Sequence, residues 1–149
     1  MHTHKANQRI QRFEAVCREH GLPITVQRRV LIDAVVRTDD HPTAEELWAR
    51  AREVLPDISR TTVYRILDTF VDLGLVERVP HPRGAARFDG NTEPHHHLIC
   101  TKCKQVFDAH DPICAYMGAP ADAPEGFDVH SCSVLFLGVC RACRLAELN

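Results

Sequence analysis

Four of the seven cysteines in this chain of 149 residues form two Cys-x-x-Cys pairs, Cys100/Cys103 and Cys140/Cys143. Two such pairs supply four soft thiolates, the donor set of a closed, tetrahedral structural zinc site. The 36 residues between the pairs exceed the spacing of a compact zinc ribbon. We therefore expect a small subdomain to fold back and join the pairs, with the alternating run at residues 129–139 as the returning strand.

The alternative is one thioredoxin-like redox pair and a chance second pair. Neither pair lies in a strand–helix–strand pattern, which favours structural zinc. The first residues are polar and lack a secretory signal, so we expect a cytoplasmic chain whose thiols stay reduced. Among the other cysteines, Cys17 is expected in the core, Cys114 as an exposed thiol open to oxidation, and Cys132 as a buried thiol.

Histidines and carboxylates near the first pair offer harder donors. In a strand, His95 and His97 would point to one face and His96 to the other. Asp89 precedes this triplet, Asp108 follows the first Cys-x-x-Cys pair, and His41 stands at the start of an expected helix. Nitrogen and oxygen donors suit Fe²⁺, Mn²⁺ or Zn²⁺ in a more exchangeable site. A solvent-exposed polar run is the competing interpretation of the triplet.

A zinc-dependent hydrolase or deaminase would draw on the same residue types. A deaminase needs His-x-Glu and Pro-Cys-x-x-Cys. The histidine triplet has no glutamate at that spacing, and neither Cys-x-x-Cys pair follows a proline. We therefore expect a protein that is not an enzyme.

The composition indicates a globular chain with unevenly distributed charge. Hydrophobic residues make up 44% and charged residues 26%, and no apolar run is long enough to span a membrane. The net charge of −2 alone gives no hint of a nucleic-acid partner. However, residues 1–87 carry 14 Lys/Arg and 12 Asp/Glu, whereas residues 88–149 carry 4 and 8. We predict two modules, residues 1–88 and 95–149, joined by a turn-rich hinge at residues 89–94.

The first module is expected to hold four helices and a hairpin. Apolar residues recur at helical spacing over Ile10–Cys17 and after Thr25, which can cap a second helix. Thr43 and Glu46 have capping-box spacing, and a fourth helix is expected from Ser59 to a point before Gly74. Extended runs at residues 75–79 and 85–88 then form a hairpin, or wing. This order is typical of a winged helix-turn-helix.

The helix that begins at Ser59 would be the recognition helix in the major groove. Its outer face presents side-chain types that hold phosphates and read bases, namely Arg60, Thr61, Tyr64 and Arg65. Further phosphate contacts could come from Arg28, Arg29 and Arg83. A merely solvated helix face is the competing interpretation.

Taken together, these segments resemble the ferric uptake regulator family of bacterial metal-dependent transcription factors, from about Arg9 to Cys143. The resemblance rests on His41-Pro-Thr-Ala-Glu-Glu46, Ser59-Arg-Thr-Thr-Val-Tyr-Arg65, Arg87-Phe-Asp89 and His95-x-His-x-x-Cys-x-x-Cys103 with the later cysteine pair. It implies an α+β fold in which a winged helix-turn-helix precedes a small α/β dimerisation domain with structural zinc. It also implies a homodimeric repressor on double-stranded operator DNA, contacted by Tyr64.

The resemblance further implies a regulatory metal site at the domain junction, occupied by Fe²⁺ or Mn²⁺. Its ligands would be His41, Asp89, His95, His97 and Asp108. In this arrangement the metal ties the two modules together and selects the shape that binds DNA.

With aspartate at position 108 the chain resembles the peroxide-stress branch of the family, because iron-uptake regulators usually carry glutamate at the matching position. Zinc-uptake regulators usually place a cysteine near Asp89. In the peroxide branch, bound Fe²⁺ reacts with hydrogen peroxide, a ligand histidine (here His41 or His95) is oxidised, and DNA is released, whereas the Mn²⁺ form represses without sensing. The alternative is an iron- or zinc-responsive regulator of the same family. Cys132 stands near the late histidine of the family's accessory metal site, so that site is expected to be altered.

Overall fold

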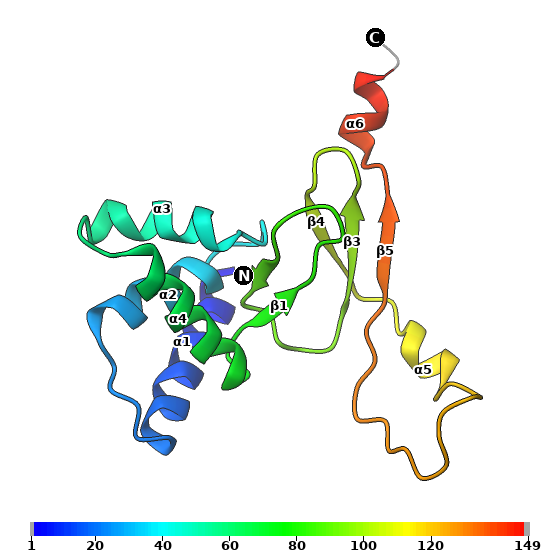
Figure 1. Ribbon diagram of the computed structural model, residues 1–149, viewed down its shortest axis with the longest axis horizontal. Coiled ribbons are helices and arrows are strands. Elements are labelled where there is room, and N and C mark those ends of the chain that lie inside the picture. Colours follow the sequence, from blue (N-terminus) through cyan, green and yellow to red (C-terminus); the bar gives the residue numbers. More distant parts are fainter. Residues whose placement is uncertain (1, 148–149) are drawn as a thin grey trace. The chain divides into compact units, whose positions relative to one another are not determined.

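The computed structural model describes residues 2–147 of the chain. The chain divides into two compact units, Met1–Thr92 and Glu93–Asn149, which are described separately below. Figure 1 traces the first unit from blue to green and the second from green to red. None of the helices in the described part of the chain is long and apolar enough to cross a membrane.

Four helices form most of the first unit: α1 (His2–Glu19), α2 (Val26–Val36), α3 (Ala44–Val54) and α4 (Arg60–Asp72) (Figure 1). Helices α2, α3 and α4 are each preceded by a residue whose side-chain hydroxyl accepts a backbone N–H of the first turn. These capping residues are Thr25, Thr43 and Ser59. Thr43 and Glu46 complete the expected capping box. Such caps satisfy N–H groups that have no partner within the helix.

The core of this unit is built from the apolar stripes of the four helices. On α4, Val63, Ile66, Leu67 and Phe70 are buried at the spacing expected for one helix face. The Phe70 ring packs edge-on against Phe13 of α1, with 5.6 Å between ring centroids. Cys17 is fully buried in the same cluster, so its expected place in the core is confirmed.

A short hairpin follows α4. Strand β1 (Glu77–Val79) pairs antiparallel with β2 (Arg87–Asp89), and Arg78 lies opposite Phe88. Phe88 is buried in the helical core and thereby anchors the hairpin to it. The strands are shorter than the extended runs expected from the sequence, because Leu75 and Val76 are buried in the turn after α4 instead. Helices followed by this wing confirm the predicted winged helix-turn-helix.

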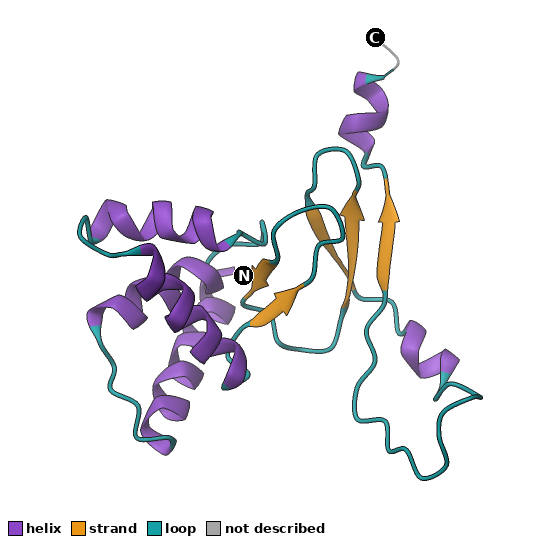
Figure 2. Ribbon diagram, in the orientation of Figure 1, coloured by secondary structure: helices purple, strands orange, loops and turns teal. Residues whose placement is uncertain are grey.

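The described part of the second unit is a three-stranded sheet with two short helices (Figure 2). Its elements are β3 (His96–Cys100), β4 (Val106–Ala109), α5 (Ile113–Met117), β5 (Leu135–Gly138) and α6 (Arg141–Ala146). The strand order is β4-β3-β5, with β3 antiparallel to β4 and parallel to β5. Helices and strands in both units confirm the α+β class.

Two expectations for the second unit need correction. The strand expected at residues 129–139 is confined to Leu135–Gly138, because β5 pairs only with His97–Cys100 of β3. The expectation of reduced thiols is also wrong for Cys114 and Cys132, which form a disulfide. Cys132 is exposed rather than buried. Spacing alone does not reveal which cysteines meet, and here the chain between β4 and β5 turns back on itself.

Candidate metal centres and DNA-binding face

The four paired cysteines converge beside the sheet of the second unit. Their Sγ atoms all lie within 4.8 Å of one another, and the Sγ atoms of Cys103 and Cys140 are 3.8 Å apart. Zn–S bonds of about 2.3 Å in a tetrahedron place the sulfur atoms roughly 3.8 Å from one another. The cluster therefore fits a structural zinc ion held by four thiolates.

Strand register explains how the two pairs meet. In the parallel pairing of β3 with β5, Cys100 lies opposite Gly138, whose carbonyl accepts the N–H of Thr101 at 2.8 Å. Cys140 follows two residues later, directly before the first residue of α6, and its backbone N–H donates to Cys100 Sγ at 3.4 Å. Cys143 lies in the first turn of α6. The returning strand thus bridges the long gap between the pairs, as the spacing predicts.

The electrostatics of this cluster favour a cation. Backbone N–H groups, first that of Cys140, lower the pKa of the Cys100 thiol to about 6. Hydrogen bonding with Cys140, together with burial and the other nearby sulfurs, raises the pKa of Cys143 to about 12. Thiolates crowded in this way repel one another, and a divalent cation at their centre removes that penalty and stabilises the deprotonated forms.

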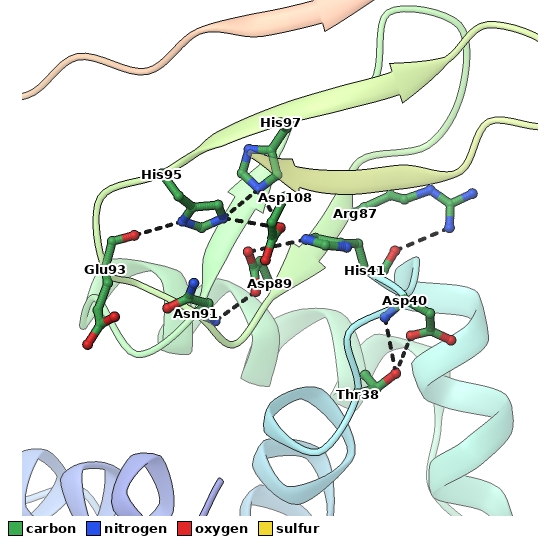
Figure 3. A network of polar contacts seen from close by, with 10 residues as sticks. All are labelled: Thr38, Asp40, His41, Arg87, Asp89, Asn91, Glu93, His95, His97 and Asp108. Atoms are coloured by element: carbon green, nitrogen blue, oxygen red, sulfur yellow. Dashed lines mark hydrogen bonds and ion pairs between the residues drawn. The ribbon is translucent and has the colours of Figure 1, made fainter. Parts of the chain in front are cut away.

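In the first unit, His41 and Asp89 form a buried pair. His41 Nε2 lies 3.3 Å from Asp89 Oδ2, and their side chains are 2% and 7% exposed. The other carboxylate oxygen, Oδ1, accepts the backbone N–H of Asn91 at 2.7 Å. The Asn91 N–H thus holds one oxygen of the Asp89 carboxylate, and the other oxygen of that carboxylate faces the His41 imidazole (Figure 3).

Strand β2 positions both members of this pair. His41 has a φ of 49°, a conformation that residues other than glycine seldom adopt. Arg87 Nη1 donates to the His41 carbonyl at 3.2 Å, and the Phe88 N–H donates to the Pro42 carbonyl at 2.9 Å. Because Asp89 follows Phe88 directly, the strand that holds the strained backbone of His41 also carries its carboxylate partner.

In the second unit, His95, His97 and Asp108 form another set of donors (Figure 3). His97 lies directly opposite Asp108 in the β3–β4 pairing. Asp108 Oδ1 is 3.4 Å from His95 Nε2 and 3.8 Å from His97 Nε2, and the two Nε2 atoms are 2.9 Å apart. His96 turns the other way, and its Nδ1 accepts the Val134 N–H at 3.1 Å.

One hydrogen bond sets the tautomer of His95. Its Nδ1 lies 2.7 Å from the Glu93 carbonyl oxygen, which can only accept, so the proton sits on Nδ1. In the neutral ring, the Nε2 atom then carries the lone pair and faces His97 and Asp108, as a metal ligand would. Nitrogen and carboxylate donors of this kind fit Fe²⁺ or Mn²⁺. Sequence reasoning missed the supporting groups, the Glu93 carbonyl and the Asn91 N–H, because every residue carries such backbone groups.

The sequence-predicted DNA contacts lie on the outer face of the first unit. Arg60, Thr61, Tyr64 and Arg65 are all exposed on α4, while the opposite face of the helix is buried. A hollow of about 260 Å³ lies at the same helix, lined by Thr25, Gln27, Arg28, Thr62, Arg65, Ile66 and Thr69. Two arginines and three hydroxyls in one hollow can hold a phosphate group.

Arg29 and Arg83 differ from Arg28 in their surroundings. Arg29 Nη1 forms an ion pair with Glu14 Oε1 of α1 at 2.8 Å and does not line this hollow. Arg83 is exposed in the hairpin turn. The spacing of Arg28 and Arg29 could not separate these roles, since neighbouring residues on a helix point about 100° apart.

The chain is similar to a known protein family and to several individual proteins. The profile of the ferric uptake regulator family matches residues 19–137. The peroxide-responsive repressor PerR of Staphylococcus epidermidis is 34% identical over 130 residues, which cover 87% of each chain. The peroxide-responsive repressor PerR of Staphylococcus aureus is 32% identical over 130 residues, covering 87% of this chain and 88% of the relative.

Solved structures show the same fold. The ferric uptake regulator of Helicobacter pylori superposes with a TM-score of 0.77 at 20% identity, covering 93% of both chains. A zinc-bound manganese uptake regulator superposes with a TM-score of 0.66 at 31% identity, covering 85% of this chain and 97% of that one. The family profile spans most of the chain, and the match to the Staphylococcus epidermidis repressor covers 87% of it at 34% identity. This chain belongs to the ferric uptake regulator family.

Proposed function

We propose that this protein is a metal-dependent transcriptional repressor that senses hydrogen peroxide through oxidation of a ligand histidine. Members of its family are transcription regulators rather than enzymes. The peroxide-responsive repressors among its relatives support the finer assignment. The single observation that carries it is the His95 ring, whose Nε2 lone pair faces His97 and Asp108 in a buried position.

The proposed regulatory ion is held by His41 and Asp89 of the first unit together with His95, His97 and Asp108 of the second. Each set alone offers fewer donors than the octahedral shell that Mn²⁺ favours. One ion shared by both sets would restrain the two units relative to each other. Metal binding would then select the conformation that binds DNA, which is the coupling that a metal-dependent repressor needs.

Ferrous iron, when bound, supplies the electrons that reduce hydrogen peroxide. The side chains that hold the iron are then the groups nearest to the oxidant. His41 and His95 are almost fully buried, so an oxidant produced beside them meets the rings before it meets solvent. An oxidised ring is a poorer ligand, and its loss would release the restraint on the two units and then the DNA. With Mn²⁺ bound, the protein would repress without responding to peroxide.

Residues 1–88 form the proposed DNA-binding domain, residues 89–94 the hinge, and residues 95–149 the metal-binding dimerisation domain. Among the solved relatives is a zinc uptake regulator complexed with zinc and DNA (TM-score 0.69, 23% identity, covering 97% of this chain and 98% of that one). Exposed Arg60, Thr61, Tyr64 and Arg65, with Arg28 in the hollow beside them, are the proposed contacts to double-stranded operator DNA in the cytoplasm.

Pairing of two copies is supported by an apolar row across the second unit. Phe107, Leu98 and Phe136 are direct neighbours across β4, β3 and β5, and they are 44%, 42% and 37% exposed. A unit this small buries little apolar surface alone, so covering the row with a second copy would stabilise it. Phe136→Lys is expected to give monomers by light scattering, whereas Phe127→Lys, at an exposed loop position, should leave the dimer intact.

The decisive experiment is mass spectrometry of the iron-loaded protein after hydrogen peroxide. We expect one added oxygen atom on His41 or His95, in parallel with loss of DNA binding, and no addition in the Mn²⁺-loaded protein. The fragment ions must separate His41 from Trp48, because no Lys or Arg lies between them. Metal-dependent DNA binding without any oxygen gained by a histidine would instead favour an iron- or zinc-responsive regulator.

Asp108→Glu tests the branch of the family. We expect the variant to keep metal-dependent DNA binding but to release DNA much more slowly with peroxide. Asp111→Glu is the matched control, since it makes the same change at an exposed carboxylate three residues away. If Asp108→Glu responds to peroxide like the parent protein, the proposed role of Asp108 is wrong.

A further inference from the structure

The disulfide between Cys114 and Cys132 lies outside every site described above. It joins α5 to the residues just before β5, with 5.9 Å between the two Cα atoms. Cys132 is exposed and Cys114 is half-buried. Neither belongs to the group of four cysteines that fits zinc. The bridge is therefore open to reductants in solvent and is not protected by metal coordination.

The segment that this disulfide closes has little else to order it. No residue from His110 to Val134 is buried. The backbone hydrogen bonds of the turns at residues 113–127 are local, such as those from the Ala115 N–H to the Pro112 carbonyl and from the Phe127 N–H to the Pro124 carbonyl. In a segment without buried apolar contacts, little stabilising free energy offsets the conformational entropy that is lost when the segment adopts one conformation. The disulfide is thus the main restraint on this part of the described chain.

The bridge also lies next to the histidine strand. Val134, two residues after Cys132, donates its N–H to His96 Nδ1 at 3.1 Å and accepts the His97 N–H at 3.2 Å. Strand β5 begins at the following residue, Leu135. A restraint at Cys132 therefore acts on the backbone that pairs with His97 and on the strand that leads to Cys140.

We propose that Cys114 and Cys132 are a reversible dithiol–disulfide pair, a second oxidation-sensitive site that tightens or loosens the start of β5. Disulfides in a reducing compartment are mostly transient and redox-sensing, and exposed ones are the most readily reduced. This pair needs no iron, so it extends the proposed response to peroxide beyond the ligand histidines.

The chemistry balances with hydrogen peroxide as the oxidant. One thiolate attacks a peroxide oxygen, the O–O bond breaks, and a sulfenic acid forms while hydroxide leaves and takes a proton to become water. The second thiolate then attacks that sulfur, the S–S bond forms as the S–O bond breaks, and the departing hydroxide takes a proton to become a second water. The two sulfurs lose two electrons, which reduce one peroxide to two waters. An external dithiol returns the pair to two thiols by thiol–disulfide exchange and is itself oxidised to a disulfide.

The test uses the zinc-containing, Mn²⁺-loaded protein, in which histidine oxidation is not expected. After treatment with dithiothreitol and then peroxide, cleavage after Lys, Arg and Glu separates residues 105–125 from residues 126–141. We expect these two peptides to be recovered as one disulfide-linked species after peroxide and as separate peptides after dithiothreitol. Fragmentation must place the link on Cys132 and not on Cys140.

Hydrogen exchange supplies the structural readout. Reduction should speed exchange of the Val134 N–H by about tenfold or more, and the double variant C114S/C132S should exchange at that faster rate whether or not peroxide is added. The zinc content of all samples should stay the same. Separate peptides after peroxide, a link on Cys140 with release of zinc, or equal exchange in both redox states would each overturn the proposal.

Discussion

The guanidinium carbon of Arg60 lies 4.4 Å from the centroid of the Trp48 ring, although Arg60 starts α4 and Trp48 lies in the middle of α3. Arg60 Nε also pairs with Glu45 Oε2 at 3.2 Å. An arginine proposed to contact DNA is thus held by an aromatic face and an acidic side chain. The ring pre-orders the guanidinium, whereas the carboxylate competes with DNA phosphate for it.

Glu45→Gln should therefore strengthen DNA binding. Removing the competing carboxylate frees Arg60 while Trp48 still orients it. Because exposed ion pairs contribute about 0.2–1 kcal/mol, we expect affinity to rise by roughly 1.4- to fivefold at low salt. Fluorescence anisotropy with operator DNA would measure this. Glu53→Gln, the same change at an exposed position later in α3, should raise affinity less; equal effects would mean that only net charge matters.

Thr43→Ala should destabilise the first unit and loosen His41. Thr43 Oγ1 accepts the Glu46 N–H at 3.2 Å, and Glu46 Oε2 accepts the Thr43 N–H at 2.7 Å. Loss of such a cap costs about 1 kcal/mol. Urea unfolding should record that loss, and isothermal titration with Mn²⁺ should show weaker binding. Thr43→Ser keeps the hydroxyl and is expected to restore both; failure of serine to do so would exclude the cap as the cause.

The sequence was most informative where chemistry depends on side-chain type and spacing. The zinc pairs, the capping box at Thr43 and the exposed face of α4 follow from such patterns. Where two neighbouring residues of one type could contact DNA, spacing did not predict which of them would do so. Arg28 lines the hollow beside α4, whereas Arg29 pairs with Glu14. Contacts between elements, such as Arg60 on Trp48, depend on how helices pack and leave no mark in local periodicity.

The cysteines between β4 and β5 illustrate the limit in another way. An odd number of cysteines correctly excludes complete pairing, yet it does not exclude one bridge among three unassigned residues. Cys114 and Cys132 meet because a segment without a buried core folds back on itself, and no apolar pattern there predicts that path.

Gly90→Ala should displace Asp89 and destabilise the first unit. A Cβ at Gly90 would lie 2.9 Å from Val36 Cα and 3.2 Å from the Val35 carbonyl oxygen, both backbone atoms of α2. Relief of this overlap must move β2 away from α2, at a cost of about 1–3 kcal/mol. Denaturant unfolding checks the value. Gly84→Ala, whose Cβ meets only the movable His81 ring, should change stability little; a similar loss there would point to a general glycine effect.

Cys17 should remain a neutral thiol and make the first unit less stable at alkaline pH. Burial raises its pKa above the ordinary value, although the charge of Arg28 opposes this. The unfolded thiol ionises near pH 8.5, so the stability due to Cys17 is complete below that pH and declines above it until the folded thiol also ionises. The decline is at most about 1.4 kcal/mol per pH unit.

The measured quantity is the difference in free energy of unfolding between the parent protein and Cys17→Ala. Urea unfolding at pH 7.5 and 9.5 should show this difference becoming smaller as pH rises, since all other groups titrate alike in both proteins. In the folded parent protein, Cys17 should also resist iodoacetamide at neutral pH. A gap independent of pH would mean that Cys17 ionises equally well in both states.

Loss of zinc should unfold the second unit and leave the first intact. The large apolar core cluster lies wholly within residues 6–88, whereas the buried apolar residues in the described part of the second unit are Ile99, Cys100 and Val106. The sheet that orders His95, His97 and Asp108 therefore depends on the cysteine cluster, because metal-binding free energy serves as folding free energy in so small a unit. Cys103→Ser should keep most helical circular dichroism but lose Mn²⁺ binding, and Cys103→His, which can still bind zinc, should retain both. If the serine variant binds Mn²⁺ like the parent protein, the strand pairing around His97 is stable on its own and zinc is not what orders the regulatory donors.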